Sequence, residues 1–184
     1  MRFLTNKIIC NDWLNSIGLK QYQAIFKTNS VDGRVLSTLQ RKDLDKYFGV
    51  HKRIHQTSIL TAIELLKKYE FDYENFKTIR FESETKDISL WSNDSFHDWL
   101  KLVSLEVKIT CFNKNKFRVK INLVSVLKSY ADNLSESGLH GAFVADSSFN
   151  IDALYEALRV DEIKHHHIRK IIEDEIKLLK KSKL

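Results

Sequence analysis

Three adjacent histidines, His165, His166 and His167, are the residues that most readily suggest metal chemistry. An apolar stripe with helical spacing follows them, so we expect them at the start of the last helix. Consecutive residues on a helix point about 100° apart, which prevents three adjacent side chains from closing around one ion. Zinc ligands on a helix are instead spaced by a turn. The sequence therefore predicts a solvated helix start and no metal site.

Catalytic chemistry has no clear candidate either. The seven histidines form no Ser/His/Asp arrangement that the sequence makes convincing, and no glycine-rich phosphate loop, HExxH motif or paired-carboxylate motif is present. We therefore predict that the chain is not an enzyme and needs no cofactor.

Composition favours helices joined by short turns. The 184 residues include no proline and only five glycines, while 43% are hydrophobic and 29% are charged. Two cysteines give no disulfide framework and indicate a reducing compartment. No apolar run reaches the roughly 20 residues that span a bilayer. We expect a cytoplasmic protein.

An internal repeat divides the chain. Asp12-Trp13-Leu14 recurs as Asp98-Trp99-Leu100, and Val31-Asp32-Gly33 pairs with Leu139-His140-Gly141. Each half ends in a long amphipathic stripe. The predicted fold is all-α, a tandem of two five-helix domains over 8–71 and 91–181. Trp13 and Trp99 are expected in the two cores.

The segment between the halves, 72–90, is charged but also carries apolar residues such as Phe76 and Ile88. It is too apolar for a free tether, so we expect it to pack between the domains. Trp91, just after it, is expected to pack at this interdomain contact.

Residues 106–127 interrupt the second repeat. Five of them are basic and one is acidic, so this segment supplies most of the net charge of +6. Apolar residues alternate from Val107 to Cys111 and again from Phe117 to Leu123, around Asn113-Lys114-Asn115-Lys116. This alternation predicts a β-hairpin insert. The insert is either a binding elaboration or sequence that splicing normally removes.

The chain resembles the SAM (sterile alpha motif) domains of the kazrin and liprin family. In the first half the resemblance rests on Trp13-Leu14, Ile17-Gly18-Leu19, Tyr22, Val31-Asp32-Gly33-Arg34, Asp43-Leu44, Gly49-Val50 and Ser58-Ile59-Leu60. In the second half it rests on Trp91-Ser92-Asn93, Tyr130-Ala131-Asp132-Asn133-Leu134 and Ser137-Gly138-Leu139-His140-Gly141-Ala142.

These sequence segments resemble the family's second and third SAM domains, and they look more similar to kazrin than to liprin. The resemblance implies a scaffold at cell junctions, including desmosomes, and the cytoskeleton. It implies plakin or armadillo-catenin proteins as partners. The segment 106–127 departs from the family pattern.

SAM domains in general associate by setting an acidic middle surface against the basic start of a last helix. In the first domain the basic candidates are Lys52, Arg53 and His55, and the acidic ones are Asp43 and Asp45. In the second domain the basic candidates are Lys164, His167, Arg169 and Lys170, and the acidic ones are Asp146, Asp152 and Glu156. Because the two surfaces differ, such contacts would be head-to-tail, with other SAM domains or with a second copy.

Two other functions remain open at this point. One is RNA binding through basic residues of the last helix, although the charge outside 106–127 is modest. The other is membrane-surface binding through the basic insert.

Overall fold

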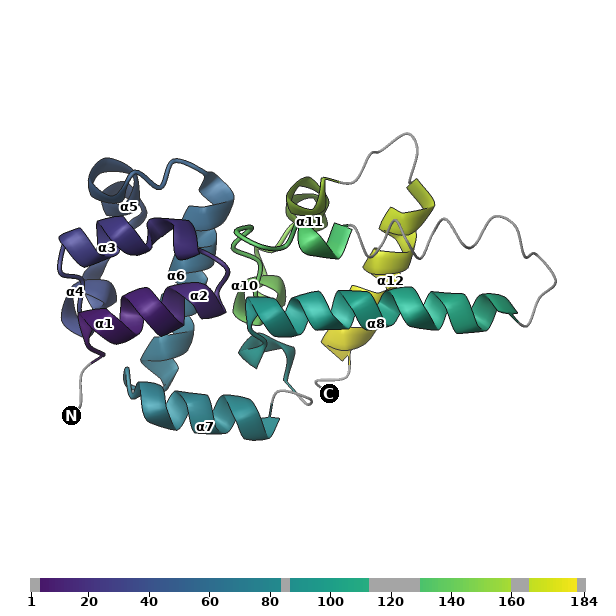
Figure 1. Cartoon of the computed structure of the whole chain (residues 1–184), viewed down its shortest axis with the longest axis horizontal. Coiled ribbons are helices and arrows are strands. Elements are labelled where there is room, and N and C mark those ends of the chain that lie inside the picture. The colour runs from purple at the N-terminus through teal and green to yellow at the C-terminus, as the bar shows by residue number, and fades with distance from the viewer. Residues whose placement is uncertain (1–3, 84–86, 113–129, 160–165, 182–184) are drawn as a thin grey trace.

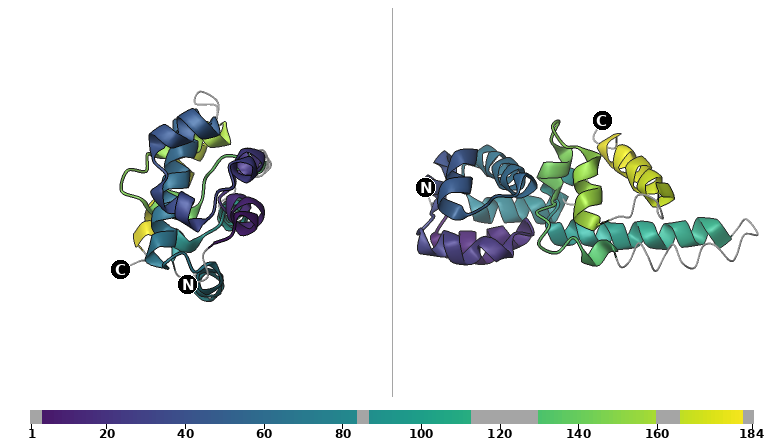
Figure 2. Two further views of the ribbon diagram at one scale, coloured as in Figure 1. Left: turned by 90° about the vertical axis from the view of Figure 1, so that its left-hand side faces the viewer. Right: turned by 90° about the horizontal axis from the view of Figure 1, so that it is seen from above.

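The computed structural model describes residues 4–83, 87–112, 130–159 and 166–181. In this part of the chain every regular element is helical, which confirms the all-α prediction. Figure 1 shows two groups of helices side by side, and Figure 2 shows α8 running along the second group and beyond it.

The first group has five helical segments. The first is continuous, through α1 (Asn6–Ile8), the π-helical turn η1 (Ile9–Trp13) and α2 (Leu14–Ser16). The second joins η2 (Lys20–Tyr22) to α3 (Gln23–Thr28). The others are α4 (Gly33–Thr38), α5 (Arg41–Phe48) and the long α6 (Arg53–Lys68).

Two elements follow between the groups, α7 (Tyr73–Ser83) and the 3₁₀ turn η3 (Ile88–Leu90). The second group contains α8 (Asn93–Phe112), a helical turn over 130–132, α10 (Gly141–Ala145), α11 (Ile151–Leu158) and α12 (His166–Lys181).

Each group surrounds its own apolar core. Trp13 and Phe26 are fully buried in the first, and Phe96 and Leu154 in the second. Trp99 packs against the second core while staying half-buried. Short helices are unstable alone, so these cores hold them in place.

Residues 72–90 touch both cores. Tyr73 and Phe76 of α7 are buried in the first, while Phe81 near the end of α7 is exposed. Ile88 is buried in the second core and Leu90 in the first. The η3 turn therefore links the two groups through apolar contacts.

Matching hydrogen bonds reveal the repeat in three dimensions. The Asn6 amide nitrogen Nδ2 donates to the carbonyls of Phe26 and Val31, at 3.1 and 2.9 Å. Asn93 Nδ2 donates in the same way to Leu134 and Leu139, at 3.0 and 2.7 Å. Two equivalent loops are thus fixed by one kind of side-chain bridge.

The π-helical turn accounts for a one-residue difference between the repeats. Trp13 lies seven positions after Asn6, whereas Trp99 lies six after Asn93. The extra residue of the first repeat falls within η1, Ile9–Trp13, where a wider turn absorbs it without losing the register of the buried face.

The predicted β-hairpin is wrong over its first strand. The helix α8 continues to Phe112, so Val107 and Cys111 lie on a helix. Phe96, Leu100, Val103, Val107 and Cys111 also recur every three or four residues, and extending a formed helix requires no new nucleation. The rest of the predicted hairpin, 113–127, lies outside the described residues.

Candidate interaction surfaces

A buried seam joins the two domains. Gly138 N donates to the Gly18 carbonyl at 3.2 Å, and His140 Nε2 donates to the Ser58 carbonyl at 3.1 Å. Ser58 is fully buried and His140 is 1% exposed. Burial lowers the pKa of His140 to about 4, so its ring is neutral at pH 7. The centre of the seam is buried and closely packed.

Glycines allow this close approach. Gly18 and Gly138 have positive φ, at 70° and 74°. A Cβ on Gly18 would lie 2.6 Å from the Asn93 side chain, and one on Gly138 would lie 3.0 Å from Leu19 Cδ2. The lack of side chains at these two positions is therefore part of how the domains fit together.

Polar contacts lie at the edge of the seam. Gln21 Nε2 donates to the Glu136 carbonyl at 3.1 Å, and Lys20 pairs with the Glu136 carboxylate at 3.4 Å. Both partners of this ion pair are about half exposed, so it contributes little stability.

The basic start of α6 faces the second domain. Ile54 packs against the second core. Its neighbour Arg53 lines a groove of about 530 Å³ that Asp152 and Glu156 of α11 also line. Lys52 shares an adjoining pocket with Glu156. Four residues predicted as docking candidates are thus brought to one seam, basic on one side and acidic on the other.

His55 does not belong to this basic surface, which corrects the prediction. Its ring is only 4% exposed, and Nδ1 lies 2.9 Å from the Tyr22 hydroxyl. Burial, reinforced by the charge of Lys52, lowers its pKa to about 4. The side chain is therefore neutral at pH 7.

Asp43 and Asp45 of α5 already have local partners. Asp43 accepts from the Gln40 backbone N–H at 2.9 Å in a capping box. Asp45 lies 2.8 Å from His51 Nδ1, and both side chains are exposed.

The second-domain candidates divide between local and outward-facing roles. Asp146 accepts hydrogen bonds from the Ser148 backbone and hydroxyl. Arg169 lies 3.5 Å from Asp152 and stacks over the Tyr155 ring at 4.1 Å. Lys170 is exposed. Lys164 and the His167 side chain lie outside the described residues.

Trp91 packs within the second domain. Its ring lies 6.2 Å from Phe96 and 6.1 Å from Trp99, measured between centroids. Trp91 precedes the Ser92 hydroxyl that caps α8, so its side chain folds back over the first turns of that helix. The neighbouring Leu90, and not Trp91, reaches the first core.

Comparison with known proteins identifies the first half. Residues 5–67 match the SAM domain (sterile alpha motif) family. Over 169 residues, 90% of this chain, it is 36% identical to kazrin from Homo sapiens. It is 31% identical over 175 residues to liprin-alpha-4 from Rattus norvegicus. Residues 5–67 thus match a SAM domain, and most of the chain is similar to kazrins and liprin-alphas.

The match covers a small part of these relatives. The chain spans 19% of human kazrin and 15% of rat liprin-alpha-4. Kazrin-A from Danio rerio is 36% identical over 174 residues, again 19% of its length. Among the described residues, no helix is long and apolar enough to cross a membrane.

Seam residues such as Ser58, Gly138 and His140 were missed by sequence reasoning. Their types are those of an ordinary helix and turn, and only the docking of the domains makes them neighbours. The repeat gave one indication that His140 has a special role. Gly33 and Gly141 are equivalent, but the residue before the glycine changes from Asp32 to His140.

Proposed function

We propose that this SAM tandem is a non-catalytic interaction module of a kazrin/liprin-like scaffold, and that its two domains act as one unit. The observation that carries the proposal is the pairing inside the chain. The basic start of α6 faces the acidic α11, with Ile54 packed between them. One domain thereby serves as the docking partner of the other.

The same pairing can continue outward. The start of α12 is equivalent to the start of α6, and α5 is equivalent to α11. Lys170 of α12 makes no ion pair within the part of the chain that the structure describes, and it is exposed. A second copy would place its α5, with Asp43 and Asp45, against the start of α12. Repetition of this contact would form an open head-to-tail chain.

This outward contact should be weak. Asp43 and Asp45 already have partners, and Lys42 and Lys46 share α5 with them. Polar contacts between exposed charges are sensitive to salt. Another SAM domain or scaffold protein with a more acidic surface would dock more tightly. From the resemblance, we place such partners among plakin or armadillo-catenin proteins at cytoplasmic junctions and the cytoskeleton.

Light scattering across protein concentration, at low and high salt, tests the self-association. We expect concentration-dependent growth that salt suppresses and that Lys170→Glu abolishes. Lys7→Glu on α1, at an exposed lysine outside both α5 and α12, is the matched control and should leave it intact. Mixing Lys170→Glu with Asp45→Lys should restore a single round of pairing. A chain that stays monomeric throughout would refute head-to-tail self-association.

RNA binding and membrane binding stay predictions. The basic residues that motivate the membrane hypothesis fall mostly in 113–129, outside the described residues.

A further inference from the structure

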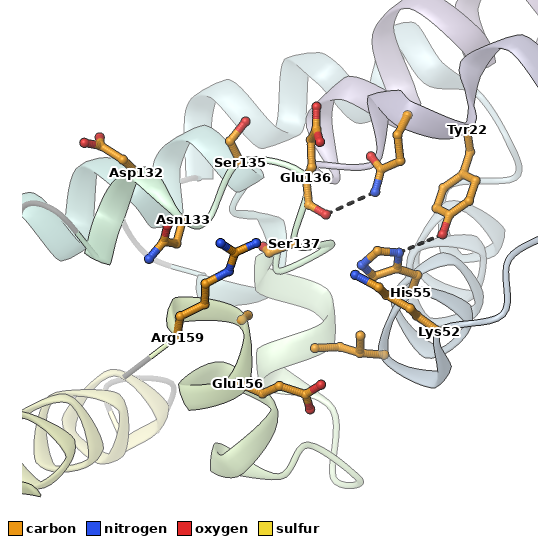
Figure 3. A pocket seen from close by; sticks show the side chains of 13 residues that line it. Tyr22, Lys52, His55, Asp132, Asn133, Ser135, Glu136, Ser137, Glu156 and Arg159 are labelled. Carbon is orange, nitrogen blue, oxygen red and sulfur yellow. Dashed lines mark hydrogen bonds between the residues drawn. The ribbon is translucent and has the colours of Figure 1, made fainter. Parts of the chain in front are cut away.

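A polar pocket opens where the two domains meet. Its volume is about 500 Å³. The first domain contributes Tyr22, Lys52 and His55, and the second contributes Glu156 and Arg159 (Figure 3). The pocket therefore exists only when the domains are docked.

Arg159 occupies a backbone conformation that arginine rarely adopts. It ends α11 in the left-handed region, with φ 55° and ψ 42°. The equivalent residue at the end of α5 is Gly49, with φ 62° and ψ 24°. The fold thus requires a left-handed residue here, and glycine meets that requirement without strain. An arginine held in a strained backbone conformation points to a role for its side chain.

Two cations in the pocket have no partner. Neither the Lys52 ammonium nor the Arg159 guanidinium makes an ion pair or hydrogen bond in the described part of the chain. Figure 3 shows both extending toward the open space from opposite domains. Both side chains are exposed at the mouth of the pocket, so an anionic group that enters between them can pair with a cation from each domain.

The nearby carboxylates do not fill that role. Asp132 lies 3.6 Å from His97, and Glu136 lies 3.4 Å from Lys20. Both carboxylates turn away from the pocket in Figure 3. Glu156 alone points into it, so two cations face one carboxylate.

His55 adds a neutral donor. The Tyr22 hydroxyl, 2.9 Å from His55 Nδ1, donates to that nitrogen in the arrangement that leaves the proton on Nε2. Nε2 has no partner among the described residues and can donate to a ligand at the pocket wall.

We propose that this pocket binds an acidic peptide segment of a partner protein. A side-chain carboxylate of the segment lies between Lys52 and Arg159, and His55 donates to it. Glu156 accepts from a backbone N–H of the same segment. Because both domains supply the cations, binding depends on the docked tandem.

This inference deepens the proposed scaffold function by naming a partner chemistry. It is independent of the head-to-tail contact, because it uses Lys52 and Arg159 while that contact uses Lys170. Peptide binding can fail while self-association persists, and the reverse. Variants of Lys52 and Arg159 test peptide binding, whereas variants of Lys170 test self-association.

The test is fluorescence polarisation with a labelled hexaglutamate peptide, on the full chain. Arg159→Gly and Lys52→Met should each weaken binding at least tenfold, and Glu156→Gln should strengthen it severalfold. Lys27→Met, equally reduced in charge but outside the pocket lining, should bind like the wild type.

Arg159→Gly also excludes misfolding as an explanation. It places the preferred residue at a left-handed position, so the midpoint of urea unfolding should rise while peptide binding is lost. Equal weakening by Lys27→Met would show that net charge alone attracts the peptide and would overturn the proposal. So would undetectable binding, or binding of inorganic phosphate in place of the peptide.

Discussion

Replacing Gly138 with alanine measures how tightly the seam is packed. Gly138 and Gly49 both have positive φ, at 74° and 62°. A Cβ on Gly138 would lie 3.0 Å from Leu19 Cδ2 and 3.2 Å from Ser58 Oγ, whereas one on Gly49 would have no neighbour within 4 Å. Gly49→Ala is therefore a matched control that carries the backbone cost without the contact.

The expected magnitudes follow from this comparison. Each alanine costs about 1 kcal/mol for the left-handed backbone. Crowding in a packed region adds roughly 1–3 kcal/mol, so Gly138→Ala should lower the free energy of unfolding by about 2–4 kcal/mol. Gly49→Ala should lower it by about 1 kcal/mol.

Urea unfolding at 25 °C, followed by tryptophan fluorescence and by circular dichroism, provides the assay. Trp13 reports on the first core, and Trp91 and Trp99 report on the second. Equal losses for Gly138→Ala and Gly49→Ala would refute the close interdomain packing. In that case Leu19 and Ser58 would not lie against Gly138 in solution.

Further predictions concern single residues at the seam and in the loops. Because burial lowers the pKa of His140 to about 4, the unfolded chain takes up its proton first as pH falls. His140 therefore contributes stability above pH 6.5 that is lost by pH 4, about 3 kcal/mol, and His140→Gln should flatten urea midpoints across that range. Asn93→Ala leaves the buried Leu139 carbonyl without its side-chain donor, while the Leu134 carbonyl still accepts from Ser137 N, so the loss should be about 1–3 kcal/mol. Asn6→Ala should cost slightly less because its bonds are half-buried. An unchanged midpoint for either would contradict the bridging role. Lys20→Ala removes an exposed ion pair with Glu136, so calorimetry should show a loss below about 1 kcal/mol, and a larger loss would mean that the pair is better shielded than its exposure indicates.

Local patterns in the sequence predicted the helices well. Asp32 precedes α4 and accepts hydrogen bonds from Arg34 N and Val35 N, a capping role that aspartate favours. The stripe from Ile59 to Leu66 is buried along α6. Such features depend on residues within a turn or two of each other, so they can be predicted from the local sequence.

The error at 107–111 has a physical cause. A short apolar run fits both strand alternation and helical spacing, and only its attachment to a formed helix decides between them. His55 was misjudged for a related reason. Its place beside Lys52 and Arg53 indicated a basic surface, but the Tyr22 hydroxyl and the surrounding core determine its charge.

Most helices, the repeat, the similarity to kazrins and liprin-alphas, and the signs of the charged surfaces could be predicted from the sequence. The tertiary structure decided which of those charges meet. It set Arg53 across from Asp152, buried His140 against Ser58, and placed Arg159 in a pocket with Lys52. The reason is that docking brings together residues about a hundred positions apart, and the electrostatic energy of a group depends on those neighbours and on burial.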